Sequence, residues 1–162
     1  MTNRFMKAAL AGTVFAAAFA STGAQAATAT ATAKAQILKQ ITVTKTADLD
    51  FATIITGAAA SSVIVSPAGV KTCGAGLVCT GTVAAAAFGI VGTTGSVVTL
   101  AADPSVTLNS GANSMTATLL TSAATRTLTG TDSFTVGGTL AVGASQADGA
   151  YTGTFTVTVN YQ

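Results

Sequence analysis

Short segments in which apolar and polar residues alternate, separated by turn residues, run through the chain from residue 41 to its end. Such alternation places successive side chains on opposite faces of a β-strand. Val and Thr, which favour strands, are abundant, and turn residues such as Asp103, Pro104 and those of 109–113 mark the breaks. No window after the first residues has helical periodicity. The pattern predicts an all-β fold, a single immunoglobulin-like antiparallel β-sandwich.

The first residues have the three parts of a secretory signal peptide. Arg4 and Lys7 precede an apolar run over residues 8–20, and small residues lead to Ala24 and Ala26, an A-x-A cleavage pattern. The run is shorter than the roughly 20 residues that cross a bilayer. We predict cleavage after Ala26, so that residues 1–26 are the signal peptide, 27–40 an N-terminal extension with its hinge, and 41–162 the sandwich domain.

The charges after residue 26 cancel, and they form no basic cluster. The cations are Lys34, Lys39, Lys45, Lys71 and Arg126, and the anions are Asp48, Asp50, Asp103, Asp132 and Asp148. Binding to nucleic acid or to anionic lipid usually requires a basic stripe or patch. We therefore expect no nucleic-acid partner, and no second stretch is apolar and long enough to predict a membrane-spanning segment in the mature chain.

The residue types needed for most enzyme chemistry are missing. The chain has no His, and its five acidic residues are all Asp. Ser-His-Asp and Cys-His catalytic systems are therefore impossible, and the usual ligands for zinc or copper are lacking. Asp48 and Asp50 are compatible with a calcium site, but on an alternating strand they are more simply solvent-facing. We expect no catalytic residue, no metal and no cofactor, and hence no enzyme.

The two cysteines, Cys73 and Cys79, form an even pair in a chain predicted to be exported. An oxidising compartment favours a structural disulfide between them. A redox pair is the alternative, but the spacing is not Cys-x-x-Cys. A loop this short contributes about 2 to 2.5 kcal/mol of stability on the loop-length formula.

The last segment of the chain has the cleanest alternation. Gly149 precedes this segment. The apolar face of the segment consists of Tyr151, Phe155, Val157, Val159 and Tyr161. The segment resembles the terminal strand of chaperone–usher pilins, in which a glycine at this place and a penultimate tyrosine bracket an alternating strand. The resemblance implies that this segment is an assembly strand; the alternative is the last strand of any β-sandwich.

The residues after the predicted cleavage site also alternate strictly. The face that a strand here would turn inward comprises Ala29, Ala31, Ala33, Ala35 and Ile37. The phase slips at Leu38 and Lys39, which predicts a hinge over residues 38–40. We interpret residues 27–37, called the arm below, as a candidate donor strand that completes the sheet of another subunit. A disordered Ala/Thr tail is the alternative.

Residues 41–51, 134–140 and 149–161 also resemble a bacterial family of secreted domains of unknown function, grouped with spore-coat-U-like and fimbrial proteins. The resemblance implies a pilin-like sandwich from a Gram-negative bacterium, exported through the periplasm to the cell surface. The partners that it implies are other copies of the chain or related subunits, a periplasmic chaperone and an outer-membrane usher. Two features depart from well-known pilins: the arm has Ala where theirs have bulky residues, and the cysteines close a short loop.

These observations predict a structural subunit of a surface fibre or coat, assembled by donor-strand complementation. The alternative is a monomeric, self-complemented secreted domain that binds a carbohydrate or a protein through its loops.

Overall fold

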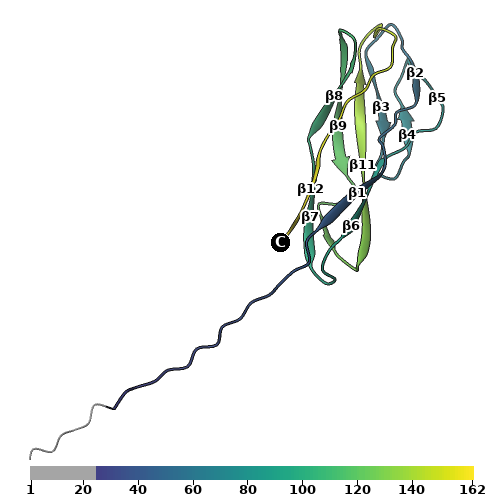
Figure 1. Ribbon diagram of the computed structural model, residues 1–162. Coiled ribbons are helices and arrows are strands. Elements are labelled where there is room, and N and C mark those ends of the chain that lie inside the picture. Colours follow the sequence, from purple (N-terminus) through teal and green to yellow (C-terminus); the bar gives the residue numbers. More distant parts are fainter. Residues whose placement is uncertain (1–24) are drawn as a thin grey trace, which may run out of the picture. The chain divides into compact units, whose positions relative to one another are not determined.

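A computed structural model describes residues 25–162, so that most of the predicted signal peptide lies outside the described residues. The described part of the chain is all-β, with antiparallel sheets and no helix, which confirms the predicted fold class (Figure 1). None of its segments is therefore a helix long and apolar enough to cross a membrane. The twelve strands are β1 (Thr42–Ala47), β2 (Thr53–Ile55), β3 (Ser61–Val65), β4 (Lys71–Cys73), β5 (Val78–Thr80), β6 (Ala86–Val91), β7 (Val97–Ala102), β8 (Ser105–Ser110), β9 (Asn113–Thr121), β10 (Thr125–Thr127), β11 (Thr131–Val142) and β12 (Val157–Tyr161).

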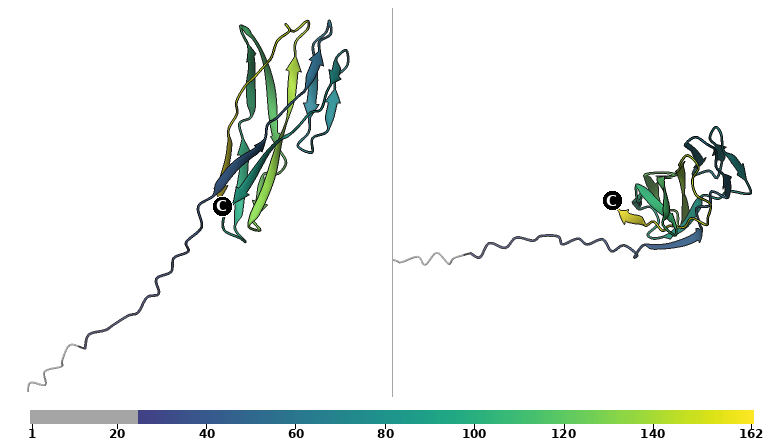
Figure 2. Two further views of the ribbon diagram at one scale, coloured as in Figure 1. Left: turned by 45° about the vertical axis from the view of Figure 1, so that its right-hand side comes forward. Right: turned by 90° about the horizontal axis from the view of Figure 1, so that it is seen from above.

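Strand β11 is the centre of the larger sheet, whose order is β1-β6-β11-β3-β4. The first half of β11 pairs with β6 and its second half with β3, while its other edge pairs with β9, which in turn pairs with β8. A second sheet has the order β10-β7-β12, and β2 pairs with β5 in a small two-stranded sheet. Figure 2 shows these sheets packed as the layers of a sandwich.

Gly137 and Gly138 lie inside β11, which runs through both without interruption although glycine pairs often mark turns. A side chain on Gly137 would collide with the backbone of Val65 and Pro67, and one on Gly138 would press on the Thr118 carbonyl. These glycines therefore allow neighbouring chain segments to approach closely. A close approach of this kind is one reason why glycine occurs inside a strand.

Two clusters of buried side chains form the core. The lower cluster, as seen in Figure 1, lies between β6, β7 and β11 and contains the stacked rings of Phe88 and Phe134, whose centroids are 5.2 Å apart. The upper cluster contains Phe51, Val63 and Leu140. Residues Leu49 and Phe155 pack against both clusters, so the two form one continuous interior.

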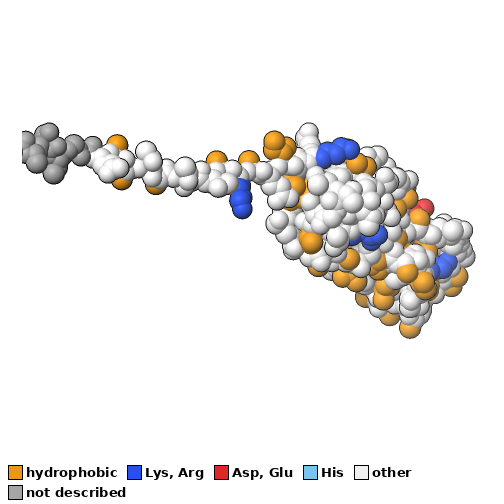
Figure 3. Space-filling view, turned by 90° about the horizontal axis from the view of Figure 1, so that it is seen from below, with side chains coloured by type: hydrophobic (Ala, Val, Ile, Leu, Met, Phe, Trp, Pro, Cys, Tyr) orange, Lys and Arg blue, Asp and Glu red, His pale blue; other side chains and the backbone are white. Residues whose placement is uncertain are grey.

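Few charged groups are visible on the sandwich from below, where scattered hydrophobic side chains lie among polar ones (Figure 3). This agrees with a chain of which only 7% of the residues are charged. Isolated apolar side chains are normal on a protein surface, whereas a large contiguous apolar patch indicates an interaction site.

Candidate groove between the first and last strands

The first and last strands of the sandwich each have one unpaired edge. Strand β1 pairs with β6 and strand β12 pairs with β7, and each stands at the end of its sheet order. Within residues 25–162, no other strand pairs with the second edge of either one. An unpaired edge presents free backbone donors and acceptors, to which another strand can be added.

The backbone of the C-terminal segment, residues 149–161, shows which of its groups are free. The Thr152 and Asn109 backbones exchange hydrogen bonds of 2.8 and 3.1 Å, and the Asp103 N–H donates to the Thr156 carbonyl at 3.0 Å. Even-numbered residues therefore face β7 and β8. Successive residues of a strand direct their backbone groups to opposite edges, so within β12 the residues Val157, Val159 and Tyr161 face the open edge.

Side-chain burial along this segment also alternates. Residues Thr152, Thr154, Thr156, Thr158 and Asn160 are exposed, while Tyr151, Phe155, Val157, Val159 and Tyr161 are only half-buried. The Phe155 ring meets Phe88 of the core edge-on, with centroids 6.3 Å apart. Inward-facing side chains of a fully covered sandwich would be buried. Their partial exposure shows that the core is incompletely covered beside the last strand.

The regular strand is shorter than the sequence pattern suggests, since β12 begins at Val157 and leaves Gly149, Tyr151 and Phe155 outside it. The partner strand is interrupted at Asp103 and Pro104, and proline has no backbone N–H to continue a ladder. The Asp103 carboxylate instead accepts the Thr156 N–H at 2.7 Å. Gly149 has a φ of 151°, and a side chain there would collide with Ser110 Oγ. Its backbone thus requires glycine.

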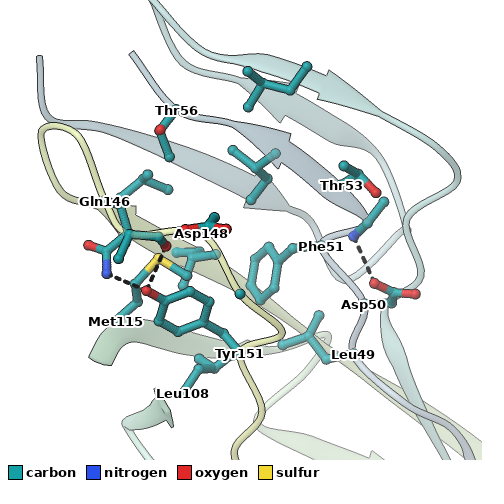
Figure 4. A pocket seen from close by; sticks show the side chains of 17 residues that line it. Leu49, Asp50, Phe51, Thr53, Thr56, Leu108, Met115, Gln146, Asp148 and Tyr151 are labelled. Atoms are coloured by element: carbon teal, nitrogen blue, oxygen red, sulfur yellow. Dashed lines mark hydrogen bonds between the residues drawn. The ribbon is translucent and has the colours of Figure 1, made fainter. Parts of the chain in front are cut away.

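A wide pocket of about 510 Å³ lies beside the start of the C-terminal segment (Figure 4). Its inner wall is buried and apolar, and consists of Phe51, Leu140 and Val142. The rim carries the polar residues Asp50, Thr53, Thr56, Gln146 and Asp148. Leu108 and Met115 complete the apolar lining, although nothing in the sequence marks them as site residues.

Hydrogen bonds fix the side of the pocket that the C-terminal segment forms. The Tyr151 hydroxyl donates to the Ala147 carbonyl at 2.8 Å and accepts from Gln146 Nε2 at 2.9 Å (Figure 4). The Gln146 amide also donates to the Ser114 carbonyl at 3.4 Å. The aromatic ring of Tyr151 is thereby held against the pocket, with its polar tip satisfied.

A narrow pocket of about 160 Å³ lies next to the wide one, and the two share Leu49. Ala86 and Phe88 form its floor, and residues 153–155 form its wall on the side of the last strand. Lys45 and Asp48 stand at its lip as an exposed ion pair of 2.7 Å, which contributes little stability in water. We call the two pockets together the terminal groove, because residues 45–56 line one side and residues 146–155 the other.

The two carboxylates that are compatible with a calcium site each have another partner. The Asp48 carboxylate pairs with Lys45, and the Asp50 carboxylate accepts the Ala52 N–H at 2.7 Å. Within the described part of the chain, no three His, Cys, Asp or Glu side chains are grouped as metal ligands. Alternation instead places Leu49 and Phe51 inward and the two carboxylates outward, as in the simpler interpretation.

Residues 27–35 of the arm belong to a separate unit, whereas the unit that contains the sandwich begins at Gln36 and so includes the last two residues of the arm. In residues 27–35, neither helix nor strand is present and every side chain is exposed. Ile37 follows and is 93% exposed, whereas Val43 of β1 is 36% exposed. Lys39, placed in a hinge by the sequence, is held at its backbone: its N–H donates to Thr93 Oγ1 at 2.6 Å, and its carbonyl accepts from the Tyr161 hydroxyl.

Cys73 and Cys79 form a disulfide with their Cα atoms 5.9 Å apart. The bond joins β4 to β5, which belong to different sheets. It therefore fixes the small β2-β5 sheet to the main sheet, rather than closing one hairpin. The ammonium group of Lys71 adds to this link by donating to the Cys79 and Gly81 carbonyls at 3.3 and 3.0 Å.

One buried charge was not evident from the sequence. Asp132 in β11 is only 6% exposed, and its carboxylate accepts from the Thr129 N–H at 2.7 Å and from Arg126 at 3.1 Å. The Thr129 N–H is the main cause that lowers the pKa of Asp132, and Arg126 lowers it further, while burial acts in the opposite direction. The carboxylate therefore stabilises the turn before β11, away from the terminal groove.

Comparison with known proteins gives a family for the domain. Neither a curated protein nor a solved structure matches the chain significantly. A family model described as a domain of unknown function, DUF4402, matches residues 41–161, which include every residue that lines the terminal groove. The chain belongs to the DUF4402 family.

Proposed function

We propose that the protein is a structural subunit of a bacterial surface fibre or coat, and that its copies assemble by completing one another's sheets. The single observation that carries this proposal is the free edge of the last strand beside the terminal groove. Val157, Val159 and Tyr161 of β12 offer unpaired backbone groups there, and their side chains are half-buried. An added strand would satisfy the backbone and cover the side chains at once.

The arm has the features of that added strand. Its side chains are exposed, its residues alternate Ala with polar residues, and it precedes the domain by only a few residues. Burying one methyl group contributes only about 0.8 kcal/mol, so several alanines and Ile37 must act together. The backbone hydrogen bonds along the open edge add to this, at about 1 kcal/mol each.

Export and partners complete the proposal. The signal peptide would direct the chain to the periplasm, where a chaperone would cover the open edge until an usher exchanges it for the arm of another copy. The role is mechanical and needs no catalytic group. These partners rest on the resemblance to chaperone–usher pilins, and the terminal groove is the surface that they would share.

A monomeric domain that covers its own groove is the second candidate. The wide pocket favours it, because a pocket of about 510 Å³, lined by both loop and strand residues, is large enough for a small ligand. The two candidates predict different oligomeric states. In the first, the arm joins copies into oligomers; in the second, the protein is a monomer with or without the arm.

Removal of the arm tests the proposal. The mature chain, residues 27–162, should form oligomers or fibres that gel filtration and electron microscopy detect, and a chain starting at residue 38 should remain a monomer with an intact fold. Adding a peptide with the sequence of residues 27–37 should raise the Tm of the shortened chain. A peptide in which each odd residue is exchanged with its even neighbour is the matched control. Monomers from both chains would contradict the proposal.

A further inference from the structure

We propose that the wide pocket is a binding site for a small organic cation with an apolar body. The inference goes beyond the proposed assembly and does not depend on it, because none of the residues that line this pocket belongs to β12, whose free edge carries that proposal. Three features of the pocket carry it: an apolar interior, a rim whose only charges are negative, and a strained backbone on two sides.

The interior of the wide pocket is formed by side chains of the core. Phe51 is 7% exposed, and Leu140 and Val142 are each 2% exposed. The half-buried side chains of Leu108 and Met115 continue this surface. A metal ion or another strongly hydrated ion needs several oxygen ligands, which such a wall does not offer. The interior therefore favours a ligand with an apolar body.

The charged side chains that line the pocket are both carboxylates. Asp50 and Asp148 stand at its rim, and among the described residues no Lys or Arg lines it. Neither carboxylate has a salt-bridge partner within residues 25–162. The narrow pocket differs, because Lys45 neutralises Asp48 at its lip. The rim of the wide pocket is thus complementary to a cation and repels an anion.

Two aromatic rings line the same pocket, those of Phe51 and Tyr151 (Figure 4). The Tyr151 hydroxyl is already bonded to Ala147 and Gln146, so Tyr151 offers a ligand its ring rather than its polar tip. The face of an aromatic ring attracts a cation. An ammonium group at the rim would therefore have carboxylate and aromatic partners, while its apolar body contacts the interior.

The backbone is left-handed on both sides of the pocket. Ala52 has a φ of 57° and Ser145 a φ of 49°, and they are the only non-glycine residues with positive φ in the part of the chain that the structure describes. Ala52 lines the pocket, and Ser145 directly precedes Gln146, which lines it from the other side.

Hydrogen bonds hold both strained residues. The Asp50 carboxylate accepts the Ala52 N–H at 2.7 Å, and the Ser145 N–H donates to the Gly57 carbonyl at 3.0 Å, which joins the segments after β2 and β11. Strained backbone of this kind costs energy and is concentrated at ligand sites. The pocket therefore has a fixed shape before any ligand enters it.

Three probes of similar size and different charge test the inference on the mature chain, residues 27–162. Phenethylammonium is a cation, phenethyl alcohol is neutral and phenylacetate is an anion, and all three carry a phenyl ring. Ligand-observed NMR titrations measure each dissociation constant, whatever the size of the protein particle. For a ligand this small we expect a constant on the order of 1 mM for the cation. The alcohol should bind about threefold to tenfold more weakly, and phenylacetate more weakly still.

Neutral variants locate the charges that select the cation. Asp148→Asn and Asp50→Asn should each reduce the preference for the cation over the alcohol about twofold or more. Asp50→Asn retains an oxygen that can accept the Ala52 N–H, and thermal melts check that the fold is kept. Asp48→Asn is the matched control, because it changes the net charge equally but lies outside the wide pocket, and it should leave the preference unchanged.

A charge introduced at the rim is the complementary test. Thr53→Arg places a cation on the lining and should reverse the order, so that phenylacetate binds more tightly than phenethylammonium. Thr80→Arg, at the position paired with Thr53 on β5, adds the same charge outside the lining and should keep the parent's order.

Each other outcome overturns the proposal. Equal affinity for the three probes would refute the class of ligand, and absence of binding at ten times the expected constant would refute the site. An equal effect of Asp48→Asn and Asp148→Asn would show that the preference comes from the net charge of the surface. Fibre formation is measured separately by electron microscopy, so this inference and the proposed assembly can each fail alone.

Discussion

The hydroxyl group of Tyr161, the penultimate residue, donates to the carbonyl of Lys39 at 2.6 Å, across the gap between the two ends of the domain. The same hydroxyl accepts the N–H of Thr93 at 2.7 Å. One side chain therefore holds the start of the domain, the end of the domain and the turn before β7 in a fixed arrangement. We call these two hydrogen bonds of Tyr161, with Lys39 and Thr93, the latch. The latch holds the C-terminal end of β12, whose second edge is otherwise unpaired, and it fixes the backbone of Lys39, which follows the arm.

Tyr161→Phe should remove the latch without removing the ring. The hydrogen bond to the Lys39 carbonyl is exposed, so water can replace the lost hydroxyl there. The Thr93 N–H is partly buried and would lose its acceptor. We expect a loss of about 1 to 2 kcal/mol in the free energy of unfolding, measured by denaturant titration. Thr158→Ala, an exposed position on the same strand, should cost less than 0.5 kcal/mol. Equal stability of Tyr161→Phe and the parent would show that the latch has no energetic role.

Acid should weaken the turn that Asp132 holds. The pKa of Asp132 is lowered in the folded state, chiefly by the Thr129 N–H. A carboxylate with a lowered pKa stabilises the fold above its unfolded-state value of about 3.9, and this stabilisation is lost as the pH falls through the folded-state pKa. Asp132→Asn should therefore lower the Tm at pH 7, and the difference from the parent should shrink below about pH 4. Asp148→Asn, an exposed position, is the control and should change neither.

The disulfide should be formed in protein taken from the periplasm, so that Cys73 and Cys79 react with an alkylating reagent only after reduction. The double change to Ser should cost about 2 to 2.5 kcal/mol, because the closed loop is short. Local effects should concentrate in β2 and β5, since the bond attaches their sheet to β4. Hydrogen exchange would show faster exchange there in the double variant; uniform exchange across the sandwich would contradict this role.

Glycine at position 137 should be required by packing and not by flexibility. Gly137→Ala brings a methyl group against the Val65 carbonyl and Pro67, and Val65 cannot move without disturbing the pairing of β3 with β11. We expect a destabilisation of about 1 to 3 kcal/mol, as for other overpacked sites. Gly89→Ala in β6 is the matched control, because its methyl group would meet the Thr44 carbonyl at an ordinary 3.9 Å. Thermal melts of the two variants give the comparison.

Assembly should depend on the parity of positions in the arm. Ala31→Asp and Ala33→Asp would each bury a carboxylate against the core of a neighbour, at a cost of several kcal/mol. Thr30→Asp and Thr32→Asp should change little, because their side chains would stay in water. Electron microscopy should show fibres only for the even positions, while the melts of all four monomers coincide. Equal fibre yields would refute the donor strand, and parity in monomer stability would indicate self-complementation.

Composition and alternation determined the fold class, because strand periodicity and turn residues are local properties that sequence records directly. The alternation also identified Phe155, Val157 and Val159 as members of one apolar face, and the structure shows them half-buried. The pairing of Cys73 with Cys79 could be read from the count and the predicted compartment. A donor role for the arm was proposed from its alternation and stays a prediction.

Only the tertiary structure decided where the last strand ends as a regular strand and which edges stay unpaired. Pairing partners lie far apart in the chain, as with Val159 and Leu100 of β7, and nothing local specifies them. The wide pocket likewise depends on Leu49, Leu108 and Met115, which come from three separate segments. Alternation fixes which side of a strand is apolar, but long-range packing alone fixes what covers that side, and here it leaves the last strand half-covered.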